Sequence, residues 1–341
     1  GSRRSLTLTG TRGPSAAMSR RAAQALLPLL LLPGWLASGL EAAEGHPGAA
    51  GDPGLGFKVH LFAPAGNASL PVIFFVSGFA GDAPVSTYSD LLTEIADRGF
   101  VVVGLDRLGV PDYPRQARDF LRVLDWARGG ALRAALRAQG LAAVPDVEGR
   151  SCVMGHSEGN HVVGQALNYD CSVAKAWVMI DPVDGYDPYR FVKSQDLIKP
   201  GQRLNFTIPA LILDNALDTR PTVPIFPACD PYEMGTSRFY PAMRGPVWNV
   251  NASDYGHVDC LNQAFDRDWV CASDPASDKA AYRAHLADTT ALFFRSLFAG
   301  QQANLQLLAD YGTFKVNVTL KQDLKGLAPG AVRAGCEGGP P

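Results

Sequence analysis

Short apolar runs alternate with amphipathic stretches along most of the chain, and this alternation restricts the fold more than any other feature. The apolar runs have the length of buried strands and occupy residues 57–64, 72–78, 100–106, 150–155, 175–181, 208–214 and 246–251. The amphipathic stretches have helical spacing and occupy residues 86–99, 114–139, 158–169 and 278–298. A break in the second is expected at Gly129-Gly130. Buried strands separated by helices form mostly parallel sheets that are covered on both faces. The sequence therefore predicts an α/β fold.

The domain boundaries follow from the same pattern. One α/β domain is expected over residues 56–300. A flexible linker rich in Gly, Ala and Pro, 40–55, precedes this domain. A C-terminal extension, 301–341, follows it, and we expect a possible edge strand at 313–321 and a disordered end.

The N-terminal region has the pattern of a secretory signal peptide. Between Met18 and Gly39, two arginines precede a Leu-rich run and then small residues. The run is shorter than the roughly 20 apolar residues that a membrane span needs. We therefore expect a removed signal peptide at 18–39, an upstream extension at 1–17, a secreted protein, and no stable membrane span in the mature chain.

Sequons and cysteines agree with export. Asn-x-Ser/Thr acceptor patterns for N-glycosylation occur at Asn67, Asn205, Asn251 and Asn317. The chain has six cysteines, which could form up to three disulfides in an oxidising compartment. Cys152 lies in a predicted core strand and is better explained as a buried thiol.

Composition and spacing exclude two classes of partner. No Cys/His spacing indicates a metal site, so no metal and no cofactor is expected. The net charge is −2 and there is no Lys/Arg patch interleaved with aromatic residues, so nucleic-acid binding is not expected.

The clearest chemical signal is Gly-His-Ser-Glu-Gly at residues 155–159. A Gly-x-Ser-x-Gly pattern between a strand and a helix is typical of a nucleophile elbow, in which small neighbours permit a strained turn at the serine. The alternative is a Gly-rich loop with a hydroxyl at a helix start. The predicted strand before Ser157 and the predicted helix after it favour the elbow.

A serine nucleophile needs a base, and the chain has six histidines. His257 lies in a loop after a late strand, as the order Ser, acid, His in this architecture requires. We therefore expect His257 to be the base. The less suitable histidines are His46, His60, His156, His161 and His285.

Two aspartates are candidates for the acid that orients the base. Asp181 ends one predicted strand and Asp218 follows the next. Strand order alone favours Asp218, because many hydrolases of this type carry the acid after that later strand. Asp184 and Asp259 are less well placed.

Four motifs resemble the chlorophyllase family of α/β-hydrolases, over about residues 70–300. They are GHSEG, IDPVDG, PIFPACDP and DYGHVDCLN. The resemblance implies an α/β-hydrolase fold, no cofactor, and hydrolysis of a small lipophilic ester. It also implies the triad Ser157, Asp181 and His257. Asp218 remains the alternative acid, because related lipases and cutinases use that position.

The oxyanion of the reaction is expected to bind the backbone N–H groups of Phe79 and Glu158. The family usually has Arg and Gly where this chain has Glu158 and Asn160, so specificity for chlorophyll does not transfer. Residues 183–206 and 220–245 are expected to cover the cleft. Two other functions stay open: a lipase, cutinase or phospholipase-type acyl hydrolase, and a non-catalytic binding protein on the same fold.

Overall fold

The computed structural model describes residues 55–81, 83–106, 112–185, 196–222, 227–262, 271–309 and 316–324. Residues 1–40 and 41–341 form separate units, and every described residue belongs to the second. The predicted signal peptide, the upstream extension, and the two residues His46 and Cys336 lie outside the described residues.

An eight-stranded sheet forms the centre of this unit, in the order β1-β3-β2-β4-β5-β6-β7-β8. Only the two outer pairs, β1 with β3 and β7 with β8, are antiparallel. The strands are β1 (Lys58–Phe62), β2 (Ser69–Val76), β3 (Val101–Asp106), β4 (Val144–His156), β5 (Trp177–Ile180), β6 (Ala210–Asn215), β7 (Val247–Ala252) and β8 (Val318–Asp323). The predicted mostly parallel sheet is confirmed, and its helix-covered form is that of an α/β-hydrolase.

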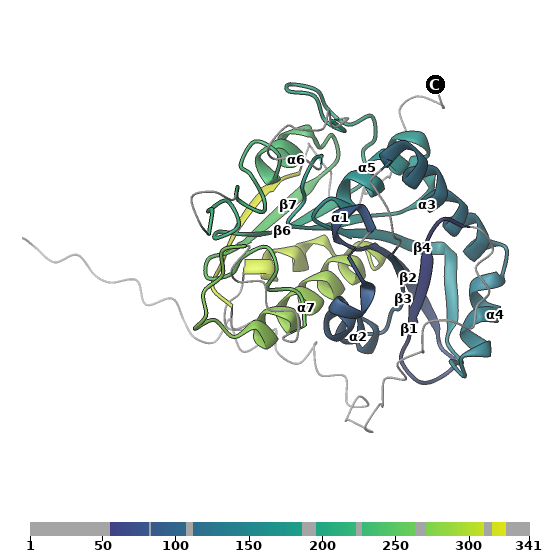
Figure 1. Ribbon diagram of the computed structural model, residues 1–341. Helices are drawn as coiled ribbons and strands as arrows, with labels where there is room; N and C mark the ends of the chain where they lie inside the picture. Colours follow the sequence, from purple (N-terminus) through teal and green to yellow (C-terminus); the bar gives the residue numbers. More distant parts are fainter. Residues whose placement is uncertain are drawn as a thin grey trace, which may run out of the picture. The chain divides into compact units, whose positions relative to one another are not determined.

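Helices cover both faces of the sheet (Figure 1). One face carries α3 (Tyr113–Arg128), α4 (Ala131–Ala138), α5 (Gly159–Tyr169) and α6 (Thr236–Ala242), and the other carries α2 (Ser89–Asp97) and α7 (Lys279–Phe298). Successive residues of a strand point to opposite faces. Thus Phe74 packs in the core under α3 and α5, whereas Phe75 packs in the core under α2 and α7.

The helical stretch 114–139 is divided at Gly129-Gly130, as predicted, and Gly130 has a φ of 88°. Other elements differ from the prediction. Strand β4 begins at Val144 rather than at residue 150, because residues 144–146 pair with β2 before a register shift at Pro71/Val72. Helix α6 and the one-turn helix α1 (Gly78–Gly81) were not predicted, since both are too short for a helical pattern.

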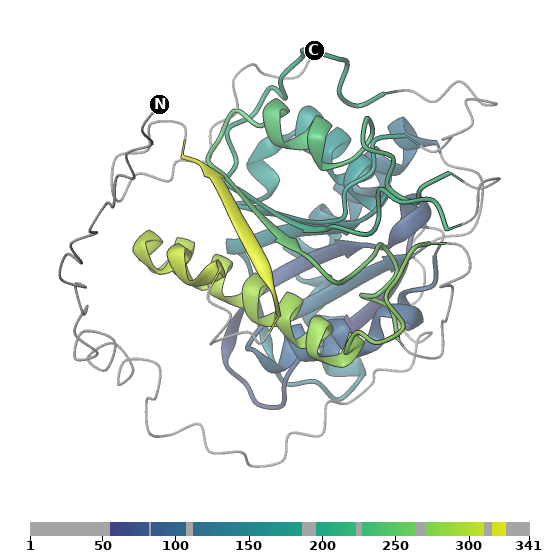
Figure 2. The ribbon, with the colours of Figure 1, turned by 90° about the vertical axis from the view of Figure 1, so that its left-hand side faces the viewer.

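The sheet brings the candidate functional residues together at the carboxyl ends of its parallel strands. Strands β2, β4, β5, β6 and β7 run parallel, so their carboxyl ends meet at one edge. Sites in α/β sheets lie at this edge. Strand β8, yellow in Figure 2, is the outer strand of the sheet beside β7 and overlaps the edge strand expected at 313–321, of which residues 313–315 lie outside the described ranges.

Candidate active site

Ser157 lies on a strained turn between β4 and α5. Its φ of 54° is in the left-handed region, which residues with a side chain rarely occupy. A Cβ at Gly155 would lie 2.8 Å from the backbone nitrogen of Asn160, and one at Gly159 would lie 2.3 Å from the carbonyl oxygen of Val76. The two glycines are therefore required by the close approach of the backbone, as the Gly-x-Ser-x-Gly pattern predicts.

His257 lies in the loop after β7, and its ring faces Ser157. The distance from His257 Nε2 to Ser157 Oγ is 2.9 Å, which is the hydrogen-bond distance between a nucleophile and its base. Burial, and then the charge of the nearby His156, lower the pKa of His257 well below its ordinary value. The ring is therefore neutral at neutral pH and can accept the serine proton.

Asp181 follows β5 and has a φ of 36°. An oxygen of its carboxylate lies within 4.8 Å of ring nitrogens of His156 and His257. Nδ1 of His257 has no hydrogen-bond partner among the described residues. The Asp218 carboxylate groups with Asp181 and Asp214 instead. The geometry therefore favours Asp181 over Asp218 as the group that faces His257.

Asn215, the last residue of β6, connects Asp181 to the loop of the base. Its Nδ2 donates to Asp181 Oδ2 and, at 3.1 Å, to the carbonyl oxygen of Gly256. Its Oδ1 accepts a hydrogen bond of 2.7 Å from the Tyr282 hydroxyl. Tyr282 lies on α7 and stacks on Tyr255 with 4.2 Å between the ring centroids. The tyrosine hydroxyl fixes the orientation of the amide, so both amide hydrogens are available to the acid and to the loop.

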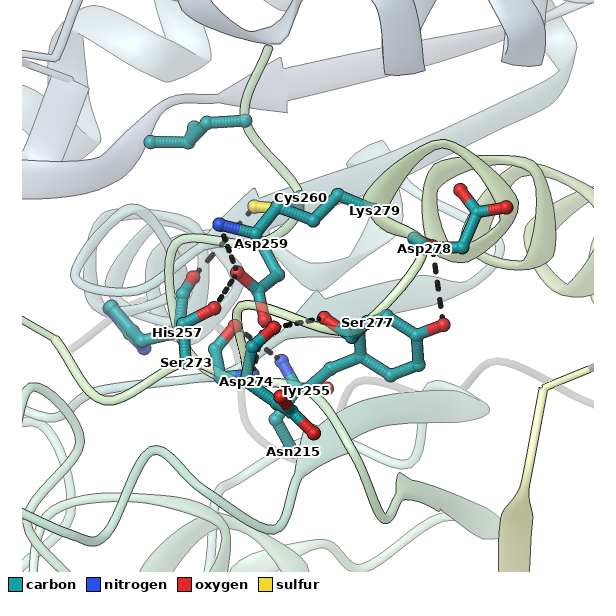
Figure 3. A network of polar contacts seen from close by, with 12 residues as sticks. Asn215, Tyr255, His257, Asp259, Cys260, Ser273, Asp274, Ser277, Asp278 and Lys279 are labelled. Carbon is teal, nitrogen blue, oxygen red and sulfur yellow. Dashed lines mark hydrogen bonds and ion pairs between the residues drawn. The ribbon is translucent and has the colours of Figure 1, made fainter. Parts of the chain in front are cut away.

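A second set of polar contacts, centred on Asp259, also holds the loop that carries His257 (Figure 3). The carboxylate of Asp259 accepts hydrogen bonds of 2.8 Å from Gly256 N and 2.6 Å from Ser273 Oγ, and lies 3.4 Å from Lys279 Nζ. Ser273 follows the disulfide between Cys229 and Cys271. Asp259 therefore ties the base loop to the start of α7 and to a disulfide-anchored segment.

A chain of hydrogen bonds connects the base to the opposite wall of the site. His156 Nε2 lies 2.9 Å from the carbonyl oxygen of His257, and a carbonyl only accepts, so this nitrogen carries the proton. His156 Nδ1 then accepts from the Tyr88 hydroxyl at 2.8 Å, and the Tyr88 oxygen accepts from Gly78 N at 3.0 Å. Burial lowers the pKa of His156 to about 4, so this relay stays neutral.

The two residues predicted to form the oxyanion hole both adjoin Ser157. Glu158 follows it at the start of α5, with its side chain buried. A Cβ at Gly78 would lie 3.7 Å from Ser157 Cβ, so the backbone of Phe79 is next to the nucleophile. Phe79 has a φ of 49° and its side chain is 50% exposed. One backbone amide is thus adjacent in sequence and the other in space.

Four buried or nearly buried carboxyl groups interact with one another near His257: Asp181, Asp214, Asp218 and Asp230. Burial raises the pKa of each, and neighbouring carboxylates add to the effect for Asp181, Asp218 and Asp230. For Asp218 the result is a pKa of about 8. Buried carboxylates this close must be neutralised, either by protons or by a cation.

A cavity of about 710 Å³ adjoins this carboxyl cluster. Asp214 and Asp230 line it, together with Asn249, Asn251 and Thr236. Ser157 does not line it, so the cavity gives access to the cluster rather than to the nucleophile.

Asp184 is structural. It accepts hydrogen bonds from Leu197 N and Ile198 N, at 2.9 and 3.0 Å. It also lies 2.8 Å from His161 Nδ1 and 3.0 Å from Arg238 Nη1. This one carboxylate therefore joins α5, α6 and the segment at 196–198.

The sequon asparagines and the cysteines differ in their exposure to solvent. Of the four sequon asparagines, Asn67, Asn205 and Asn317 are exposed, whereas Asn251 is half-buried in β7 and donates to Asp214. Cys152 is a buried thiol, as predicted, and so is Cys260. Cys171 is disulfide-bonded.

The segment expected to cover the cleft is only partly described. Phe239 belongs to the core, where its ring centroid lies 6.1 Å from that of Trp177. Tyr232 in contrast is 70% exposed. Within the described ranges, no helix has the length and apolar character to cross a membrane.

Sequence reasoning missed three residues that shape the site. Asn215 carried a usable signal, because it is a polar residue at the carboxyl end of a buried strand, where α/β sheets place their sites. Tyr88 and Tyr282 carried none, since each lies on an amphipathic segment where an aromatic residue is ordinary core.

Comparison with known proteins agrees with the geometry. A family model described as Chlorophyllase matches residues 53–322. Chlorophyllase-2 of Arabidopsis thaliana is 26% identical over 207 residues, which are 58% of this chain and 63% of that protein. Chlorophyllase-1 of the same plant is 24% identical over 265 residues, 73% of this chain and 79% of that protein. The match to Chlorophyllase-2 thus spans less than two thirds of its length.

Proposed function

Because the chain belongs to the chlorophyllase family, we propose that it is a serine esterase that hydrolyses small lipophilic carboxylic esters. Membership indicates an ester hydrolase of the α/β-hydrolase type. The observation that carries the finer proposal is the 2.9 Å contact between His257 Nε2 and Ser157 Oγ, with the serine on a left-handed turn.

In the proposed reaction, Ser157 Oγ attacks the ester carbonyl carbon while its proton moves to His257 Nε2. Asp181 stabilises the imidazolium that forms, from its position beside the ring. The tetrahedral intermediate collapses to an acyl-enzyme, and His257 returns the proton to the leaving alcohol. Water, activated by the same histidine, then hydrolyses the acyl-enzyme.

The negative charge of the tetrahedral intermediate would be stabilised by the backbone N–H groups of Phe79 and Glu158. This role depends on the main chain, so a glutamate at position 158 is compatible with it. An acidic side chain at a helix N-terminus is also favoured by the helix dipole.

Two features separate this chain from its family at the site. Asn160, where the family usually has Gly, donates from Nδ2 to the carbonyl oxygens of Ser157 and Ile180 and accepts from Trp177. Glu158 stands where the family usually has Arg. We therefore propose a lipophilic ester as the substrate class without assigning it to chlorophyll. The half-exposed side chain of Phe79, whose backbone adjoins the nucleophile, supports an apolar substrate.

We also propose that the protein is secreted through the signal peptide at 18–39. The exposed sequons at Asn67, Asn205 and Asn317 support glycosylation in the secretory pathway.

The test is labelling of the purified protein by a fluorophosphonate probe, together with hydrolysis of p-nitrophenyl esters. Ser157→Ala should abolish both, and Ser172→Ala, an exposed serine, serves as the matched control. A wild-type protein that the probe does not label would favour the non-catalytic binding protein. A panel of chlorophyll, pheophytin, triglyceride and short-chain esters separates a chlorophyllase-like enzyme from a lipase, cutinase or phospholipase-type enzyme.

A further inference from the structure

We propose that Tyr88 is a positioning residue whose hydroxyl holds two parts of the catalytic machinery in place. One is the main chain that leads into Phe79, and the other, reached through His156, is the main chain of His257. The inference rests on the proposed function, in which the Phe79 N–H binds the oxyanion and His257 is the base. It gives a role to two buried polar residues that the triad itself does not use.

The direction of each hydrogen bond in the relay follows from its last acceptor. The carbonyl oxygen of His257 can only accept, so His156 Nε2, 2.9 Å away, carries the ring proton. Nδ1 of the neutral ring must then accept, so the Tyr88 hydroxyl, 2.8 Å away, donates its proton to it. The same hydroxyl oxygen accepts from Gly78 N at 3.0 Å. A hydroxyl suits this place because it accepts from one neighbour and donates to the other.

Tyr88 itself is anchored to the sheet. It is the last residue of the 3-10 helix η2 (Val85–Tyr88) and is buried. Its ring packs edge-on against that of Phe75 in β2, with 5.1 Å between the centroids. At the other end of η2, Val85 N donates at 3.0 Å to Asp106, the last residue of β3. The hydroxyl is therefore a fixed point for the two segments that it contacts.

The contact with Gly78 supports the proposed oxyanion hole. A Cβ at Gly78 would lie 2.9 Å from the Tyr88 hydroxyl oxygen and 3.1 Å from His156 Nδ1, so a side chain there would displace the relay. The next residue, Phe79, has a φ of 49°, in the region that residues with a side chain rarely occupy. Such a conformation persists only where its surroundings hold it. The bond from Gly78 N to Tyr88 supplies this support one residue before the proposed oxyanion donor.

The contact with His257 supports the base without involving the acid. The rings of His156 and His257 lie beside each other, with 4.7 Å between their centroids. His156 also donates to the main-chain carbonyl of His257, whereas Asn215 binds the carbonyl of the preceding residue, Gly256. The base loop is thus held from the acid by Asn215 and from the oxyanion hole by Tyr88.

Tyr88→Phe tests the assignment, because it removes one oxygen atom and keeps the ring in the core. Gly78 N and His156 Nδ1 would each lose the Tyr88 oxygen, so we expect kcat on a p-nitrophenyl ester to fall about 30-fold. KM should stay within about twofold, since the supported groups act in the transition state. Tyr113→Phe is the matched control and should keep its kcat, because Tyr113 is a buried tyrosine of α3 that stacks on His161. A kcat of Tyr88→Phe within about twofold of the wild type would overturn the proposal.

Two replacements of His156 supply a rescue test. In His156→Gln the amide nitrogen can still donate to the His257 carbonyl, so we expect a loss of about 10-fold in kcat, whereas His156→Leu should lose about 100-fold. The double variant Tyr88→Phe/His156→Leu should lose little more than His156→Leu alone, because the two residues belong to one chain of hydrogen bonds. Equal losses in the two single variants, or losses that multiply in the double variant, would overturn the proposal.

A trifluoromethyl ketone inhibitor supplies a readout that a merely structural residue would not move. It forms a hemiketal in which Ser157 Oγ is bonded to the carbonyl carbon, the carbonyl oxygen is an oxyanion, and the serine proton has moved to His257. Its inhibition constant in Tyr88→Phe should rise by about the factor by which kcat falls. The corresponding alcohol forms no adduct and should bind as it does to the wild type. An unchanged inhibition constant for the ketone would overturn the proposal.

Nitrogen-15 NMR of histidine-labelled wild type keeps the proposal testable if the variants fail to fold. Burial lowers the pKa of His156 to about 4, so at pH 7 its ring should be neutral, with the proton on Nε2. A proton on Nδ1 would reverse the bond to Tyr88 and refute the proposal. Fluorophosphonate labelling tests Ser157 by itself. An unlabelled wild type refutes the esterase, whereas a labelled wild type with an unaffected Tyr88→Phe refutes only the positioning role.

Discussion

Replacement of Asn215 by alanine tests whether the site depends on the link between its acid and its base. The change removes three buried hydrogen bonds, from Nδ2 to Asp181 and Gly256 and from the Tyr282 hydroxyl to Oδ1. A bond to a carboxylate contributes about 1.5–3 kcal/mol and a neutral bond about 0.5–1.5 kcal/mol. The free energy of unfolding should therefore fall by about 2.5–6 kcal/mol.

The kinetic effect should be smaller than loss of the acid and confined to kcat. Without the amide, Asp181 loses one charge-assisted hydrogen bond, and about 1.5–3 kcal/mol corresponds to a fall of roughly 10- to 150-fold in kcat. Asn215 does not adjoin the nucleophile, so KM should change little. Tyr282→Phe leaves both amide donors in place, and we expect a loss of only about fivefold.

The assay combines urea denaturation with steady-state hydrolysis of a p-nitrophenyl ester. Asn262→Ala is the control for the loss of an amide, because Asn262 also makes three hydrogen bonds, to Ser86, Ser89 and Asp90, and none of them involves Asp181 or Gly256. It should lose stability and keep its kcat. If Asn215→Ala loses stability like the control and keeps a kcat within about twofold of the wild type, the claim that Asn215 positions Asp181 is refuted.

Three further predictions concern the turn, the base and the disulfide. Gly159→Ala should abolish activity, since its Cβ would lie 2.3 Å from the carbonyl oxygen of Val76; a variant with wild-type kcat would contradict the strained turn. The acid limb of kcat/KM should have a midpoint below pH 6.5, because burial and His156 lower the pKa of His257, which must be neutral to act as base. A midpoint at or above 6.5 would contradict this environment. Replacing both Cys229 and Cys271 by serine should lower the free energy of unfolding by about 4 kcal/mol, from the loop-entropy relation for a sequence separation of 42; an unchanged urea midpoint would refute it.

The fold could be predicted because its strands are continuous apolar runs and its helices keep one apolar face. The run at 72–78, for example, lies in the centre of the sheet as β2, and the glycine pair at 129–130 divides the helical stretch that it interrupts. The start of β4 at Val144 could not be predicted. Residues 144–149 do not form a continuous apolar run, and they join the strand by pairing with β2, which is a tertiary effect.

The sequence predicted the residue types that carry the chemistry of the site, but not the residues that hold them in position. Ser157 and His257 stand at positions that strand order alone indicates, and the structure brings them to 2.9 Å. Strand order favoured Asp218 as the acid, and only the family resemblance favoured Asp181, the residue that the geometry places beside His257. Contacts such as that of Tyr282 with Asn215 join residues 67 positions apart, so a local sequence pattern cannot predict them.

The hydrogen bonds through His156 and Tyr88 connect the loop of His257 to the backbone of Gly78, so a movement of one would displace the other. One end of this chain holds the carbonyl of the base and the other holds the amide of Gly78, next to Phe79. If the proposed esterase reaction is correct, a substrate that displaces α1 would therefore also shift the loop of His257. Acyl groups too bulky for the space beside Phe79 would then misalign the proton acceptor, and we expect them to lower kcat more than they raise KM.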